Sequence, residues 1–397
     1  MSTNPLSESW SETESVNRNS AKRAAQLDLS LLVVVLMLSS WGLLTILSAS
    51  APVAQTELHN SLFYFIRQAR WLVLGLVALT LGAVVNLGLV RKLARWGVLI
   101  TGGALLLTHI PGIGVTELGS SRWIHVGPIS VQPSEVAKLA ISVYLADLLA
   151  RNGPRSWNLS QFRQTILPIG GVLGMVLIQP DLGTTIVLAV SAFVLFFCNG
   201  TPLLTMAAVA STGIAGAVYH SLSTPYQRLR WEGFMNPWGD PTGIGYQLVQ
   251  SLMAIGSGGI LGEGWGQSKQ KLFYLPIQYA DFIFAILAEE MGLVGSLSLL
   301  GLFLILAWRG FAIAGQARDP FHALLAIGLT TTVVAQALIN IGVVTASLPT
   351  TGIPLPFLSF GGTSLLATLF SMGLILNVSR HTQRHLLIVA KGAAQPQ

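Results

Sequence analysis

Charged residues are scarce in this chain. Asp, Glu, Lys and Arg make up 10% of its 397 residues, whereas hydrophobic residues make up 52% and the mean hydropathy is +0.65. Soluble globular domains carry about 25% charged residues. This deficit excludes an ordinary soluble protein and predicts that most of the chain does not face water.

Cysteine is nearly absent as well. The single thiol, Cys198, follows the apolar residues 195–197. One cysteine excludes an internal disulfide, and nothing in the sequence indicates a zinc or iron–sulfur site. We interpret Cys198 as a buried packing residue.

The positive charge of the chain does not predict a nucleic-acid partner. The net charge is +6 and the pI is about 9.7, values that in a soluble protein would suggest such a partner. Here the basic residues lie in short segments between apolar runs, and no basic stripe with interleaved aromatic residues occurs. We therefore interpret them as determinants of membrane topology.

Apolar runs recur along the chain, and a transmembrane helix needs about 20 mostly apolar residues. These runs predict an all-α integral membrane protein with about ten spans. The polar residues 1–28 predict a disordered cytoplasmic tail, and residues 381–397 a second cytoplasmic tail. The predicted spans are 29–50, 71–90, 96–111, 135–151, 164–179, 182–200, 203–220, 281–308, 321–345 and 362–379.

The distribution of Lys and Arg predicts the orientation. With the amino terminus in the cytoplasm, the inner segments hold 14 of these residues and the outer segments 7, so both termini are expected inside. Three unusual connections, 112–134, 221–280 and 349–362, then lie on the outer side. The longest, between the seventh and eighth spans, holds three tryptophans and a stretch at 246–255 with helical spacing, so we expect it to be folded.

Ionisable residues inside spans are costly and are therefore candidates for function. Gln132 and Ser134 lead into a helix in which Glu135 and Lys138 are three residues apart, so these two can pair. The pair is either a structural ion pair or a substrate-facing one, and the sequence does not favour one reading. Asp181, between two spans, is more readily explained as a helix cap.

Four cations in the long outer loop are candidates for binding phosphate. Arg228, Arg230, Lys269 and Lys271 flank glycine-rich turns, and glycine lets backbone N–H groups approach a phosphate closely. Glycine-rich segments of this kind are more often ordinary turns than phosphate-binding sites. Taken alone, the pattern therefore favours a structural role.

Asp281 opens the eighth predicted span at the outer boundary. The positive end of the helix dipole would keep its carboxylate ionised. It is either a helix-start acid or a catalytic base. Glu289 and Glu290 lie about 12 Å deeper along the same helix, where they are either functional acids or part of a structural polar network.

Taken together, the motifs resemble those of the SEDS family (shape, elongation, division and sporulation), and within it the FtsW branch. The resemblance covers nearly all of residues 29–380. Its carriers are GSSRWI at 119–124, QPSE at 132–135 with Lys138, QPDLGT at 179–184, NPW at 236–238, GYQLVQS at 245–251, SKQKLFYLP at 268–276 and PLPFLSFGG at 354–362.

The resemblance implies a ten-helix peptidoglycan glycosyltransferase of the bacterial inner membrane, acting in septal cell-wall synthesis with a class B penicillin-binding protein as transpeptidase partner. The substrate would be lipid II, joined with inversion as one sugar's 4-hydroxyl displaces a lipid pyrophosphate. The family's presumed catalytic aspartate falls on Asp281, and its polar cavity pair falls on Glu135 and Lys138. The basic loop residues and Lys138 are then candidates for holding the pyrophosphate. No metal site or other cofactor is evident, although a divalent metal could share that task.

One departure from the family leaves two alternatives open. Family members commonly have Glu-x-His-Thr before the aspartate, where this chain reads Ile277-Gln278-Tyr279-Ala280. The loss of these polar residues would suit a non-catalytic scaffold for the division transpeptidase. Acids within spans and the broken 349–362 segment would suit a flippase for the lipid-linked precursor. The large outer loop ending on a carboxylate favours the enzyme.

Overall fold

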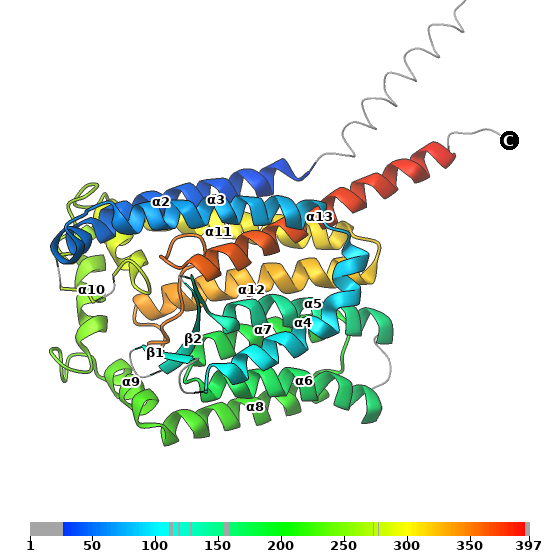
Figure 1. The fold of residues 1–397 in the computed structure, drawn as a ribbon, viewed down its shortest axis with the longest axis horizontal. Coiled ribbons are helices and arrows are strands. Elements are labelled where there is room, and N and C mark those ends of the chain that lie inside the picture. Colours follow the sequence, from blue (N-terminus) through cyan, green and yellow to red (C-terminus); the bar gives the residue numbers. More distant parts are fainter. Residues whose placement is uncertain are drawn as a thin grey trace, which may run out of the picture.

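The structure is a computed structural model that describes residues 27–110, 114–117, 120–127, 129–153, 159–272, 274–276 and 278–393. Within these residues the chain forms twelve helices and one three-stranded sheet (Figure 1). Nearly all of the predicted tail 1–28 lies outside the described residues, as do residues 394–397 of the second tail.

Ten helices overlap the ten predicted spans. They are α2 (Leu29–Leu58), α3 (Phe63–Val84), α4 (Leu87–Leu107), α5 (Pro133–Asn152), α6 (Leu159–Ile178), α7 (Leu182–Cys198), α8 (Leu203–Ser223), α11 (Ile283–Gln316), α12 (Pro320–Val344) and α13 (Gly362–Ala393). Two further helices, α9 (Pro225–Met235) and α10 (Tyr246–Gly258), lie within the long predicted loop. The helical spacing at 246–255 is therefore confirmed.

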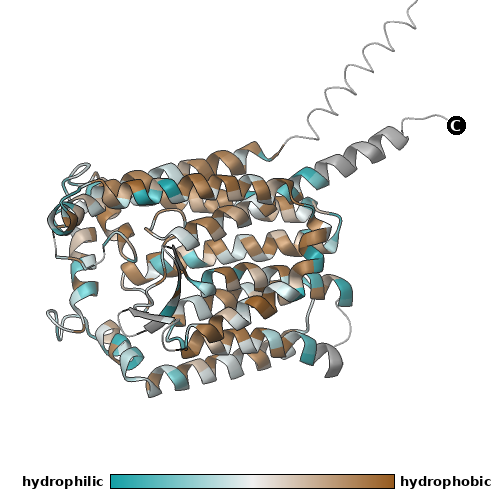
Figure 2. Cartoon of the chain, viewed as in Figure 1, coloured by the Kyte–Doolittle hydropathy of each residue, from teal (hydrophilic) through white to brown (hydrophobic). Residues whose placement is uncertain are grey.

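The chain is a multi-pass membrane protein. Among the described residues, six helices are long and apolar enough to cross a membrane, namely α2, α3, α8, α11, α12 and α13, and α6 and α7 contribute shorter apolar segments. Figure 2 shows hydrophobic residues along the long helices and hydrophilic ones gathered toward the ends of the bundle and the connections. The count of ten crossings stays a prediction.

Several predicted boundaries were wrong because basic residues were assigned to loops. α3 begins at Phe63 and includes Arg67 and Arg70, and α4 begins at Leu87 and includes Arg91. Long basic side chains can lie along a helix end and still place their charge in water. A charge near the end of an apolar run therefore does not mark where the helix stops.

The connection between α4 and α5 adds a small β-sheet, which was not predicted, to the helical fold. It forms an antiparallel sheet of strands β1 (Gly114–Glu117), β2 (Ser120–Val126) and β3 (Ile129–Val131), in the order β1-β2-β3. Ile124 pairs with Gly114 on one side and with Val131 on the other. The sheet lies at the end of the bundle that also carries α9 and α10 (Figure 1).

The first and last described parts of the chain meet at the opposite end of the bundle (Figure 1). Asp28 caps α2, its side chain accepting from Leu31 N, and its backbone N–H donates to Ser379 Oγ of α13 at 3.3 Å. The segment between α12 and α13 returns into the protein at the sheet end, and the Gln68 amide on α3 donates to Ser359 O there. Cys198 is exposed at the end of α7, so its interpretation as a buried packing residue was wrong.

Helix α11 is interrupted at Gly292, which has φ 63° and ψ −160°. The segment 259–264 fills the break. Leu293 N donates to Gly259 O at 3.0 Å, and Glu263 N donates to Glu289 O at 3.0 Å. A Cβ on Gly292 would lie 2.4 Å from a backbone nitrogen of this segment, so only glycine allows such close contact.

Candidate active site

Asp281 lies just before α11 and lines a small cavity of about 280 Å³, which includes space open to solvent. The side chain is half-buried. Helix α11 begins two residues later, at Ile283, and its N-cap position, Phe282, makes no side-chain capping bond. Asp281 therefore does not cap α11, as it would if it were only an acid at the start of the helix. The other lining residues are Arg230, Gln247, Phe282, Asn340, Val343, Thr350, Thr351, Gly352 and Ile353.

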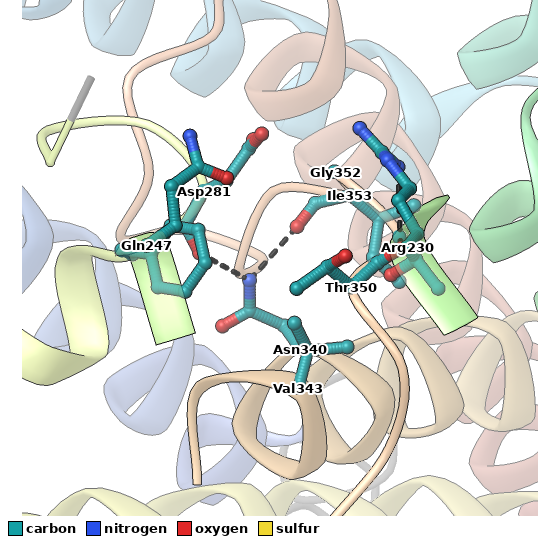
Figure 3. A pocket seen from close by; sticks show the side chains of 10 residues that line it. Arg230, Gln247, Asp281, Asn340, Val343, Thr350, Gly352 and Ile353 are labelled. Carbon is teal, nitrogen blue, oxygen red and sulfur yellow. Dashed lines mark hydrogen bonds between the residues drawn. The ribbon is translucent and has the colours of Figure 1, made fainter. Parts of the chain in front are cut away.

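Asn340 of α12 holds two backbones of this cavity together (Figure 3). Its amide donates to the main-chain oxygen of Asp281 and to that of Ile353, each at 2.8 Å. These bonds fix the segment before α11 against the segment that returns after α12. The carboxylate of Asp281 is thereby held without using its own oxygens.

Two arginines converge with Asp281 around Gly352. A Cβ placed on this glycine would lie 3.4 Å from Asp281 Oδ2, 3.7 Å from Arg230 Nη2 and 3.8 Å from Arg122 Nη1. Each guanidinium is therefore within about 7 Å of the carboxylate, although no ion pair within 4.0 Å forms. Among the residues that the structure describes, none donates a hydrogen bond to the Asp281 carboxylate, which leaves it available to a substrate.

The arginines come from different parts of the chain. Arg230 lies on α9, where it stacks on the Tyr226 ring at 4.6 Å and donates to Thr350 O at 3.2 Å. Arg122 lies on β2 and is buried. Its guanidinium donates to Pro180 O at 2.5 Å, in the turn before α7. The sheet and α9 thus bring both cations to one place.

Asp181 fixes the turn that holds Arg122. Its carboxylate accepts from Thr184 N at 3.1 Å and from the Thr184 hydroxyl at 2.9 Å, and lies 3.9 Å from Arg122. The predicted capping role of Asp181 is confirmed. It also gives Arg122 a buried counter-charge.

Electrostatics at Asp281 favour a base stronger than an ordinary carboxylate. Burial raises the pKa of the Asp281 carboxyl, and the positive charges of Arg230 and Arg122 oppose this rise only in part. Burial also lowers the pKa of Arg230, with smaller effects from Tyr226 and Arg122. A carboxylate with a raised pKa accepts a proton more readily from a weakly acidic hydroxyl.

Glu135 and Lys138 form the predicted pair inside the protein. Lys138 Nζ lies 2.8 Å from Glu135 Oε1 and also donates to the Gln336 amide oxygen of α12. Both side chains are buried, and the second oxygen of Glu135 has no partner. Gln336 donates in turn to Pro354 O at 2.8 Å. The pair therefore supports the same returning segment that lines the Asp281 cavity.

The neighbouring candidates Gln132 and Ser134 are both buried at the start of α5. Gln132 is the N-cap residue and makes no side-chain cap bond, and the Ser134 hydroxyl has no partner. Neither lines the cavity of Asp281.

Three of the four loop cations do not line this cavity. Arg228 is exposed and pairs with Glu232 at 3.0 Å, one turn along α9. Lys269 is exposed and lies 3.7 Å from Glu263. Of the predicted loop cations, only Arg230 is placed beside Asp281.

Lys271 is buried in a structural network. Its ammonium lies 3.0 Å from Glu290 and donates to Ser48 Oγ at 3.1 Å and to Gly266 O at 2.6 Å. Glu289 accepts from Lys269 N at 2.9 Å. These contacts agree with a structural polar network at Glu289 and Glu290, and Lys271 belongs to that network.

The residues that depart from the family pattern pack beside the site. The Gln278 amide donates to Ala49 O and Lys271 O, each at 3.2 Å. The Tyr279 ring contacts Tyr64 at 4.5 Å between ring centres. None of these residues lines the cavity of Asp281, and Ile277 lies outside the described residues.

Four residues of the site received no role from the sequence. Arg122 stood within a recognised motif, and Gln247 stood within another. Asn340 is a polar residue in an apolar helix, which was a usable signal. No sequence signal indicated Gly352, because the importance of this residue depends on which groups surround it in the fold.

Comparison with known proteins places these features in one family. The family model described as "Cell cycle protein", which groups FtsW, RodA and SpoVE, matches residues 28–384. Stage V sporulation protein E of Bacillus subtilis is 40% identical over 360 residues, covering 90% of this chain and 98% of the relative. The probable peptidoglycan glycosyltransferase FtsW of Thioalkalivibrio sulfidiphilus is 42% identical over 369 residues, covering 90% and 91%.

Solved structures agree with the fold. A chain from a peptidoglycan synthase complex that coordinates polymerization and crosslinking matches with a TM-score of 0.74 at 30% identity, covering 90% of this chain and 98% of that one. The rod shape determining protein RodA of Thermus thermophilus matches with a TM-score of 0.66 at 28% identity, covering 89% and 97%.

Proposed function

Because this chain belongs to the SEDS family of FtsW, RodA and SpoVE, we propose that it is a peptidoglycan glycosyltransferase that polymerises lipid II. The observation that carries the proposal is the available carboxylate of Asp281, held in a cavity between Arg230 and Arg122. A base next to fixed positive charge is what transfer of a sugar from a pyrophosphate requires.

In the proposed reaction Asp281 is the general base. The 4-hydroxyl of the acceptor sugar gives its proton to this carboxylate as its oxygen attacks the anomeric carbon of the donor. The carbon–oxygen bond to the lipid pyrophosphate breaks, and the pyrophosphate leaves with the electron pair. Attack opposite the leaving group inverts the anomeric centre.

Arg230 and Arg122 are proposed to stabilise the leaving pyrophosphate. A guanidinium stays charged and matches phosphate oxygens in geometry. The described residues offer no cluster of three His, Cys, Asp or Glu ligands. The proposed mechanism assigns charge neutralisation to the arginines.

The site favours an enzyme over the flippase and scaffold alternatives. A scaffold needs no available carboxylate between two arginines. A flippase would use the intramembrane charges, but Lys138 is occupied by Glu135 and Gln336, and Lys271 by Glu290.

Asp281→Asn tests the proposal. This variant keeps the shape of the side chain, and we expect polymerisation to fall by about 10²–10⁴-fold with folding unchanged. The assay is glycan chain length from labelled lipid II, with purified protein and its transpeptidase partner. Asp319→Asn is a matched control, because Asp319 caps α12, where Asn serves nearly as well. Normal glycan synthesis by folded Asp281→Asn would favour the flippase or scaffold.

We propose further that the chain crosses the bacterial inner membrane ten times, with both termini inside and α9 and α10 outside, and that it works at the division septum with a class B penicillin-binding protein. The match to a chain of a peptidoglycan synthase complex supports such a partner.

Cysteine labelling tests the orientation. Thr242→Cys and Gln316→Cys place thiols at exposed positions, the first between α9 and α10 and the second at the end of α11. In a Cys198→Ser background, an impermeant reagent outside the cell should label only Thr242→Cys. Labelling of both from outside would overturn the orientation.

A further inference from the structure

A second cavity is also lined by Arg230 and does not have Asp281 among its lining residues. It encloses about 230 Å³, which includes space open to solvent, and shares Arg230 and Thr350 with the first cavity. Its remaining lining residues are Pro180, Leu182, Ser221, Gln227, Trp231 and Pro349. The mechanism above uses none of these side chains.

Gln227 is the unusual member of this lining. Its side chain is 3% exposed, yet neither its amide oxygen nor its amide nitrogen has a hydrogen-bond partner. Burying a polar group without a partner is unfavourable. A buried amide that lines a cavity with both ends free is therefore well suited to bind a ligand's polar group.

The other walls limit what that group can be. Pro180, Leu182 and Pro349 are apolar, and the Trp231 ring is half-buried, with its Nε1 already donating to Ser221 Oγ at 2.7 Å. An acetamido group combines what these walls accept. Its N–H and C=O match the oxygen and nitrogen of a glutamine amide, and its methyl group suits apolar contacts. The indole face offers an apolar surface to a sugar ring.

We infer that Gln227 and its surroundings form a subsite that binds the acetamido group of an N-acetylated hexosamine. The inference rests on the proposed function, because it places one N-acetylated sugar of the substrate in the cavity that shares Arg230 with the cavity of the base. Arg230 lines both cavities, so a pyrophosphate attached to the sugar would meet it there.

Equilibrium binding to the purified full-length protein tests the subsite. The two probes are lipid II and an analogue with neutral hydroxyl groups in place of its acetamido groups. We expect the protein to bind lipid II about 10-fold more tightly, or better, since the analogue leaves Gln227 unpaired. Gln227→Leu should bind both probes with the affinity that the wild type shows for the analogue.

Two further variants control for folding. Gln267→Leu makes the same substitution at an exposed position outside both cavities and should keep the wild-type preference. Gln227→Glu keeps the shape and the acceptor but loses the donor, so it should show an intermediate preference even where the leucine variant is unstable.

The outcomes separate this inference from the proposed function. Equal binding of both probes by the wild type, or an unchanged preference in Gln227→Leu and Gln227→Glu, would overturn the subsite, whatever the polymerisation assay shows. A preference that depends on Gln227, in a protein that binds lipid II but forms no glycan, would support the subsite and overturn the polymerase.

Discussion

Gly352→Ala should separate the cost of backbone strain from the cost of filling the site. Gly352 has φ 70°, a conformation that disfavours a side chain by about 1–2 kcal/mol. The added methyl would lie 3.4 to 3.8 Å from Asp281 and both arginines, which is ordinary contact. The variant should therefore fold with a stability loss of about 1 kcal/mol.

Its effect on activity should be much larger. The methyl occupies the space between the carboxylate and the two guanidinium groups, where a hydroxyl proton and the pyrophosphate must meet them. A general base must come within about 2.6–3.2 Å of the group that it deprotonates, and a displacement of 1 Å can cost about 10²-fold in rate. We expect glycan synthesis from lipid II to fall by about that factor.

Gly153→Ala is the matched control. Gly153 has φ 64°, and a Cβ there would meet nothing within 4 Å. Its ψ of −179° lies in a region that is almost exclusive to glycine, so Gly153→Ala should lose at least as much thermal stability in detergent as Gly352→Ala, with activity retained. Gly352→Ala polymerising as fast as Gly153→Ala would refute the reasoning, because the space beside Asp281 would then not be used in the reaction.

Two further substitutions test the roles of the positive charges on Arg230 and Lys138. Arg230→Gln removes the largest influence that lowers the pKa of Asp281, so the pKa of Asp281 should rise. Because the base works deprotonated, the acidic limb of the pH–rate profile should then move to higher pH. An acidic limb that does not move would count against Asp281 as the base. Lys138→Met leaves Glu135 unpaired in the interior and should cost about 3–5 kcal/mol of stability, measured as thermal unfolding in detergent. Lys138→Met with Glu135→Gln should recover much of that loss, and wild-type stability in the single variant would show that the pair is dispensable.

The long helices could be predicted because each is a sustained apolar run, a property of consecutive residues. Their ends were less predictable where basic side chains continue the helix, as at Arg67 and Arg91. The small sheet was missed because its strands are three to seven residues long and are stabilised by pairing with one another.

Of the residues in the site, the sequence predicted a role only for those that lie in recognisable motifs or carry a charge. Asp281 was singled out by position and by family resemblance, whereas Arg230 was one of four equivalent cations. What distinguishes it is contact with Thr350, 120 residues away in the chain. Arg122 reaches the site through the Pro180 turn, and Gly352 matters through the groups around it. Such contacts depend on long-range packing, which local sequence patterns do not encode.

The break in α11 bears on how the chain is synthesised. At Gly292 the helix gives up backbone hydrogen bonds that lipid cannot replace. The segment that restores them, 259–264, precedes α11 in the sequence and is therefore already translated when the break leaves the ribosome. The broken helix therefore does not have to wait in the bilayer for a later part of the chain, and residues 259–264 can pair with α11 as it is inserted.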